Sequence, residues 1–126
     1  MGDYPAGKEY GCGLEAALAV VGGKWKVLIL WALGDGAPRR FGELRRQIGA
    51  ISEKMLIQHL KEMECDGIVS RKDYRQVPPR VEYALTEFGT SLCEALSPLC
   101  EWGHKHMERI ARCQLEQEER REKVGA

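Results

Sequence analysis

Residues 41–67 read FGELRRQIGAISEKMLIQHLKEMECDG, and the spacing of their apolar side chains decides the fold that we expect. Phe41, Leu44 and Ile48 recur at helical spacing until Gly49 interrupts the pattern. An amphipathic helix buries such a stripe and leaves the rest of its surface to water. The first part of the stretch therefore predicts a short helix followed by a tight break.

The second part of the stretch predicts a longer helix. Ser52 is a favourable N-cap, because its side-chain oxygen accepts a hydrogen bond from a free N–H of the first turn. Leu56, Leu60 and Met63 then form a stripe for the core, and Gly67 ends the helix. A short helix, a break and a second helix with a polar outer face form the pattern of a helix-turn-helix.

A β-hairpin is predicted after this pair of helices. Residues 68–74 form one candidate strand, and residues 81–85 alternate apolar and polar side chains as a half-buried strand does. The connection, residues 75–80, contains Pro78 and Pro79, which have no N–H to offer a strand ladder. We therefore expect a loop with basic residues at its two ends.

Further helices are predicted on either side of this region. Residues 14–21 and 24–33 are apolar segments separated by two glycines. On the other side, Thr86 is the expected N-cap of a long helix, which Pro98 should kink or split near Ser97. The apolar stripe of that helix consists of Phe88, Leu92, Leu96, Leu99, Trp102, Met107 and Ile110.

The formal net charge is zero, because 19 Lys and Arg side chains balance 19 Asp and Glu side chains. The charges are unevenly placed. Residues 36–80 hold ten basic and six acidic side chains, a net charge of +4, and the flanks together carry −4. Phosphate contacts require a local positive field rather than a basic whole protein. The basic section coincides with the helix-turn-helix and the hairpin, which favours nucleic acid as a partner over an ordinary mixed surface.

Composition also bounds the environment of the chain. Residues 1–10 lack the apolar segment of a secretory signal, and the most apolar stretch, residues 27–33, is too short to cross a bilayer. The five cysteines are Cys12, Cys65, Cys93, Cys100 and Cys113. They contain no CxxC pair and are expected to be thiols in a reducing compartment. We therefore expect a cytoplasmic protein without a membrane partner.

Six runs of sequence resemble the HxlR family of bacterial winged helix-turn-helix regulators, which is related to the MarR group. The runs are VGGKWK (21–26), ILWAL (29–33), RFGELRR (40–46), ISEKML (51–56), VPPRVEY (77–83) and LTEFG (85–89). They follow the family's order from about Cys12 to His106, and together they are highly specific. Two positions depart from the family: Gly13 stands where Pro is common, and Pro98 interrupts a helix that is usually continuous.

The resemblance implies a mainly α-helical protein with a small β-hairpin wing, that is, a winged helix-turn-helix. Residues 1–126 would form a single domain with a DNA-binding core at 36–85, dimerisation helices at 12–33 and 86–115, and a charged tail at 116–126 that frays or stays solvated. It further implies a homodimer that places a recognition helix in the major groove of double-stranded DNA. We expect a transcriptional regulator on a palindromic operator, with repression as the commoner outcome.

The recognition segment is expected at residues 52–61. The side chains expected to reach DNA from it are Ser52, Lys54, Met55, Gln58, His59 and Lys61. Lysine suits phosphates and guanine, glutamine pairs with adenine through two hydrogen bonds, and methionine contacts the thymine methyl group. The alternative is that these residues are the solvated face of a core helix, and the resemblance favours DNA contact.

Arginines outside the recognition segment form a second set of expected DNA contacts. They are Arg40, before the first helix of the motif, and Arg71, Arg75 and Arg80 in the hairpin. Arginine at the tip of a wing suits a narrow minor groove, where the negative potential is enhanced. For Arg80 a structural role is the alternative, in which it pairs with Glu82 or ties the loop.

Cys12 precedes the first predicted helix, whose dipole and free N–H groups favour a thiolate. In several branches of the family the matching cysteine senses electrophiles or oxidants, so the resemblance implies a redox-sensing role here. The disulfide partner in a second subunit would be Cys65, Cys93, Cys100 or Cys113. The alternative is an inert thiol packed in an interface.

The sequence disfavours two rival functions. An enzyme is disfavoured because no Gly-rich phosphate loop, G-x-S-x-G or H-E-x-x-H motif occurs. A module that binds only proteins could use the same fold, but it would not need the basic outer face. Cys100 and His104 lie one helical turn apart, yet no second pair of ligands completes a zinc site. Neither a metal nor another cofactor is therefore expected.

Overall fold

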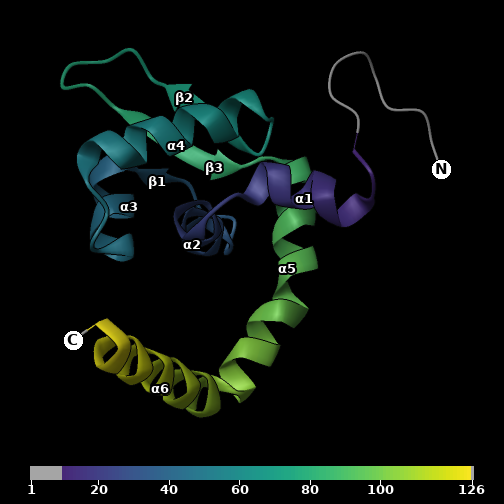
Figure 1. Ribbon diagram of the computed structural model, residues 1–126. Helices are drawn as coiled ribbons and strands as arrows, with labels where there is room; N and C mark the ends of the chain where they lie inside the picture. The colour runs from purple at the N-terminus through teal and green to yellow at the C-terminus, as the bar shows by residue number, and fades with distance from the viewer. Residues whose placement is uncertain (1–9, 126) are drawn as a thin grey trace. The chain divides into compact units, whose positions relative to one another are not determined.

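The computed structural model describes residues 10–125 and shows a mainly helical protein with a small sheet (Figure 1). The expectations about a signal segment in residues 1–9 and about residue 126 lie outside the described residues. The chain divides into two compact units between Cys93 and Glu94.

The first unit contains the predicted helix-turn-helix and hairpin. Its elements are α1 (Gly13–Val21), α2 (Lys24–Leu33), β1 (Arg39–Arg40), α3 (Phe41–Ile48), α4 (Glu53–Cys65), β2 (Val69–Asp73), β3 (Val81–Leu85) and the start of α5 (Glu87–Lys105). The predicted helices and strands of this unit are confirmed to within one or two residues at their ends. Gly49, with φ of 91°, and Gly67, with φ of 75°, end α3 and α4 in the left-handed region that glycine tolerates.

The core of this unit is built around α2, which contacts α3, α4 and β3. Ile29, Leu30 and Leu33 are fully buried on it. They pack in one core with the buried Leu44 of α3 and Leu60 of α4. In Figure 1, α2 is seen nearly end-on, with α3 and α4 beside it. The apolar stripes predicted for α3 and α4 therefore supply the core, and the opposite surface of each helix faces water.

The hairpin is part of a three-stranded antiparallel sheet in the order β1–β3–β2. β1 was not predicted, because two residues are too short to show a strand period. Arg39 pairs with Tyr83 and Arg40 with Glu82 along β1 and β3, so the segment before α3 is an edge strand of the wing sheet.

The start of α5 is fixed against the start of β2. The N–H of Thr86 donates to the carbonyl oxygen of Ile68 at 3.0 Å, and the hydroxyl of Thr86 donates to the carbonyl oxygen of Gly67 at 2.5 Å, with the Ile68 oxygen farther away at 3.1 Å. The Thr86 oxygen in turn accepts from the N–H of Gly89 at 3.0 Å, which confirms the predicted N-cap. A Cβ atom on Gly89 would lie 2.1 Å from the Ile68 oxygen, so this close approach requires glycine.

The second unit contains the rest of α5 and α6 (Met107–Gly125). Of the kink or split expected near Ser97, the split does not occur: α5 continues past Pro98, and the helix breaks at His106 instead. Of the fraying or solvation expected for the charged tail, the second is found: residues 116–125 are exposed, and they remain helical. Arg and Glu have good helix propensity, which lets this charged segment stay helical without burial.

No single helix between residues 10 and 125 is long and apolar enough to cross a membrane. α1 and α2 reach the required length and composition only as a pair, and the pair is bent by 80° at the glycines between them.

We expect Gly89→Ala to destabilise the protein by about 3 kcal/mol or more, because its methyl group overlaps the Ile68 carbonyl. Gly42→Ala is the matched control, since a Cβ there meets nothing within 4 Å on an exposed turn of α3. The control should be neutral or stabilising by up to about 1 kcal/mol. Thermal and urea unfolding measure both variants, and equal stability of the two would contradict this account of the junction.

Candidate nucleic-acid interface

The outer surface of α4 carries five of the side chains that the sequence predicts to face DNA. Its core stripe is buried, so the opposite face is left to solvent. Lys54, Gln58 and Lys61 are all exposed on that face. Ser52 lies just before them, where its hydroxyl oxygen accepts from the N–H of Met55 at 3.1 Å. Met55 itself is 37% exposed, so all five are accessible from outside.

One flank of α4 is tied to α2 by an ion pair. The buried Lys26 places its Nζ 2.8 Å from Oε2 of Glu62, and the amide of Gln58 donates to Oε1 of Glu62 at 3.3 Å. The Lys26 ammonium, together with the Gln58 amide, holds the pKa of Glu62 below its ordinary value of 4.5. Lys26 thus orients Gln58 through Glu62, and it holds the recognition helix on the core.

His59 does not lie at the predicted DNA surface. Both of its ring nitrogens are buried without a hydrogen-bond partner, and Nδ1 is 3.6 Å from the carboxylate of Glu62. The His59 side chain is 14% exposed, and its position on α4 lies between the core stripe and the flank that carries Glu62. The ring nitrogens of His59 are thus turned away from solvent, and the contact of His59 with the DNA backbone stays a prediction.

The wing presents basic side chains on strand β2 and in the loop that follows it. Arg71 and Lys72 are exposed on β2. Arg75 has φ of 50°, in the left-handed region, and its N–H donates to Oδ1 of Asp73 at 2.9 Å. This turn places the exposed Arg75 at the start of the loop, and Val77 in the same loop is 97% exposed. The loop projects its side chains into solvent, as the prediction for Arg75 requires.

Arg80 follows the structural alternative. Its Nη2 lies 2.7 Å from Oε1 of Glu82, and its guanidinium sits 4.2 Å from the centre of the Tyr74 ring. The hydroxyl of Tyr74 donates to the other oxygen of Glu82 at 3.0 Å. The guanidinium and the hydroxyl lower the pKa of Glu82, and Glu82 raises the pKa of Arg80. Arg80 therefore braces the base of the wing loop, and its expected role as a free DNA contact does not fit this pairing.

The arginines before α3 differ in how they are used. Arg39 lies within ion-pair distance of Asp35 and also donates to the carbonyl of Ala32 at 3.4 Å. Arg40 is exposed, and no ion pair of its side chain occurs among residues 10–125. Its backbone N–H is occupied by the Glu43 carboxylate at 3.0 Å. The guanidinium of Arg40 is exposed beside the helix-turn-helix, and its charge helps to lower the pKa of Glu82, its partner across β1 and β3.

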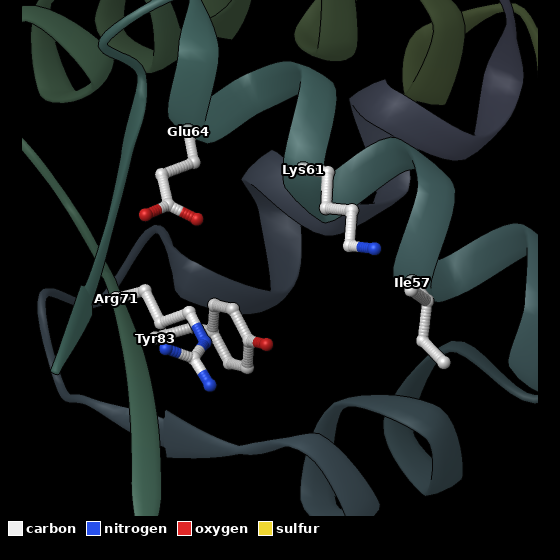
Figure 2. A pocket seen from close by; sticks show the side chains of 5 residues that line it. All are labelled: Ile57, Lys61, Glu64, Arg71 and Tyr83. Carbon is white, nitrogen blue, oxygen red and sulfur yellow. The ribbon is translucent and has the colours of Figure 1, made fainter. Parts of the chain in front are cut away.

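A cavity of about 360 Å³ lies between the other flank of α4 and the sheet (Figure 2). It is lined by Ile57, Lys61 and Glu64 from α4 and by Arg71 and Tyr83 from the hairpin. Arg71 and Tyr83 are direct partners in the β2–β3 register. The fold thus brings two predicted DNA contacts, Lys61 and Arg71, to one place. Glu64 and Tyr83 were missed, because only the packing of the helix beside the sheet reveals them.

Cys12 is the exposed N-cap residue of α1, and its side chain makes no capping hydrogen bond. Cys65, Cys100 and Cys113 are also exposed thiols, whereas Cys93 is half-buried with its Sγ 3.9 Å from the carbonyl oxygen of Leu30. No group of three or more His, Cys, Asp or Glu side chains with the geometry of a metal site occurs in the part of the chain that the structure describes.

These helices, the three-stranded sheet and the basic outer surface define a winged helix-turn-helix protein. A family model described as HxlR-like helix-turn-helix matches residues 20–111. The chain therefore belongs to the HxlR-like helix-turn-helix family and is a transcriptional regulator of that type, as its sequence resemblance implied.

Individual relatives agree with this assignment. The uncharacterized HTH-type transcriptional regulator YkvN of Bacillus subtilis (strain 168) is 52% identical over 101 residues, which are 80% of this chain and 85% of YkvN. Among solved structures, the redox regulator HypR in its reduced form matches with a TM-score of 0.75 and 42% identity, covering 80% of this chain and 99% of HypR. Oxidised HypR matches with a TM-score of 0.69 and 46% identity, covering 75% and 96%.

The Arg80–Glu82 pair predicts an acid-dependent wing. Because the pKa of Glu82 is lowered in the folded protein, the pair stabilises the wing fully above the ordinary value of 4.5 and loses its effect as pH falls through the lowered pKa. Amide NMR signals of β2 and β3 should show a step below pH 4.5 that is absent in Glu82→Gln. Glu119→Gln is the control and should keep the step. A step of equal size in Glu82→Gln and in the unchanged protein would contradict the assignment.

Proposed function

We infer that the protein is a homodimeric, sequence-specific DNA-binding repressor whose affinity for its operator changes when Cys12 is oxidised or alkylated. The observation that carries the DNA-binding part is the exposed outer face of α4 beside a basic wing. Lys54 and Lys61 are both solvent-exposed there and have no ion pair among the described residues. Exposed cations at one recognition surface are what phosphate and base contacts require.

On this proposal the residues divide by task. Base edges in the major groove are read by Gln58 and Met55, and Lys54 meets guanine or a phosphate. The neighbouring phosphates are held by Ser52, Lys61, Arg40 and Arg71. Arg75 enters or borders the minor groove from the wing loop. All of these residues lie within the stretch that matches the HxlR-like helix-turn-helix family model, which supports a role in regulation of transcription.

A homodimer is proposed because both units expose large apolar side chains. Leu14, Leu18, Trp31 and Phe88 are exposed in the first unit. Leu99, Trp102, Met107 and Leu115 are exposed in the second. Apolar and aromatic side chains of this size mark association surfaces more often than they face water. A two-fold dimer would present two α4 helices to the two halves of a palindromic operator.

A gel-shift titration tests DNA binding, with the DNA upstream of the protein's own gene as probe and a random duplex of equal length beside it. We expect tight, salt-sensitive and probe-selective binding. Lys54→Ala should weaken the free energy of operator binding by about 1–3 kcal/mol. Arg75→Ala should reduce the slope of log affinity against log salt concentration by about 1. Both changes remove contacts without touching the core.

Arg120→Ala is the matched control, because Arg120 is an exposed arginine of α6 outside the matched family region. It should bind as the unchanged protein does. Equal weak binding of both probes by every variant would favour the rival function, a module that binds proteins rather than DNA. Unchanged affinity of Lys54→Ala and Arg75→Ala alone would show that another face meets DNA.

The thiol switch is proposed from the exposed position of Cys12 and from the similarity to a redox regulator. In its oxidative form, Cys12 of one subunit and a cysteine of the other lose two electrons and two protons to the oxidant and form a disulfide. Cys65, Cys100 and Cys113 are the exposed candidates for the second thiol. Such a bond would change the geometry of the dimer and with it the spacing of the two α4 helices.

We expect diamide to weaken operator binding and a thiol to restore it, while Cys12→Ser should bind DNA and ignore diamide. The measurement is the same gel shift, together with sedimentation of reduced samples, which should run as dimers of the 14.2 kDa chain. Cys93→Ser is the control, because that thiol is half-buried. Diamide sensitivity retained in Cys12→Ser would assign the switch to another cysteine.

A further inference from the structure

The cavity between α4 and the wing brings two cations, a carboxylate and a phenol hydroxyl together, which the rest of the outer face of α4 does not do. Lys61 and Glu64 enter it from the helix, one turn apart, and Arg71 and Tyr83 enter it from two paired strands (Figure 2). Ile57 supplies the apolar part of the lining. The site therefore combines residues from three elements, so its shape is set by the packing of the recognition helix on the hairpin.

The polar groups of this cavity are not used by the fold. Within residues 10–125, no opposite charge lies within the 4.0 Å of an ion pair from Lys61, Arg71 or Glu64. The hydroxyl of Tyr83 has no hydrogen-bond partner there either. This differs from the other flank of α4, where Glu62 is occupied by Lys26 and Gln58. Ammonium, guanidinium and hydroxyl donors left free in one cavity suit a tetrahedral oxyanion.

Glu64 limits how much negative charge the cavity accepts. Two cations and one carboxylate give the lining a net charge of +1. A phosphodiester carries one negative charge, whereas free phosphate and phosphate monoesters approach two near neutral pH, because their second pKa is about 6. One phosphodiester therefore balances the lining, and a dianion would leave a surplus negative charge beside Glu64.

We propose that the cavity is a site for one backbone phosphodiester of DNA, and that Glu64 is the residue that selects it over dianionic phosphates. The phosphate oxygens accept from Lys61, Arg71 and the hydroxyl of Tyr83. Glu64 repels any second charge, so free phosphate and phosphate monoesters do not compete with DNA at the interface. This inference rests on the proposed DNA binding and gives it a chemical selectivity.

Substituting Glu64 by glutamine tests the selectivity, because it keeps the size of the side chain and raises the net charge of the lining from +1 to +2. Affinity for a random duplex should rise about three- to tenfold at low salt. Inorganic phosphate, added in place of chloride at constant ionic strength, should compete with DNA in Glu64→Gln and not in the unchanged protein. Glu119→Gln changes the total charge equally on α6 and should show neither effect.

The site itself is tested by Lys61→Gln, Arg71→Gln and Tyr83→Phe. Each lysine or arginine change should lower duplex affinity about tenfold and reduce the salt slope by about 1, and Tyr83→Phe should lower affinity about threefold. If these variants and Glu64→Gln bind as the unchanged protein while Lys54→Ala is weakened, the phosphate site is refuted and DNA binding stands. If no form of the protein binds duplex DNA, the proposed function fails first.

Phosphate competition of equal strength in the unchanged protein and in Glu64→Gln would also overturn the selectivity. Circular dichroism melting of each variant separates loss of binding from loss of folding. All four side chains are partly or fully exposed, so the variants should melt close to the unchanged protein.

Discussion

The packing of the first compact unit depends on the carbonyl oxygen of Ile68, which lies where β2 begins and α5 starts. This oxygen accepts a hydrogen bond from the N–H of Thr86, the Thr86 hydroxyl binds the neighbouring carbonyl of Gly67, and Gly89 passes so close to the Ile68 oxygen that no side chain fits between them. α4 has just ended at this point, β2 begins there, and α5 starts from the same residue cluster. This peptide group thus links the end of α4, the start of β2 and the start of α5, and its buried carbonyl oxygen is satisfied by the Thr86 N–H.

Beyond that junction, α4 has three faces with different surroundings. Its core stripe is apolar and buried. The flank toward α2 is closed by the Lys26–Glu62 ion pair, which also encloses His59. The flank toward the sheet stays open and forms the cavity with Arg71 and Tyr83. Residues one turn apart on a helix share a face, so a shift of one position moves a side chain from the outer face toward the interior. That is why Gln58 is exposed and His59 is not.

Electrostatics in this protein is local rather than global. A chain with no net charge gathers basic groups around the helix-turn-helix, and the fold then decides which of them are free. Arg39 forms an ion pair with Asp35, and Arg80 forms one with Glu82. These two pairs stiffen the segments that flank the interface. Lys54 and Arg75 are exposed and have no ion pair within residues 10–125. Some acidic residues form ion pairs with basic side chains. Others reduce the net positive charge around basic side chains that they do not pair with.

The sequence by itself determined the helices, the hairpin, the family and the face of α4 that points outward, because these follow from local periodicity, capping residues and short motifs. Ser52, Thr86 and the glycines at 49 and 67 mark element ends through interactions within a few residues. The tertiary structure alone decided the two-residue strand β1, the continuation of α5 past Pro98 and the helical tail. It also decided the burial of His59, the pairing of Arg80 with Glu82 and the meeting of Lys61, Glu64, Arg71 and Tyr83. The physical reason is that a partner side chain is chosen by packing between elements distant in the chain, and no periodicity in one element records what lies opposite it.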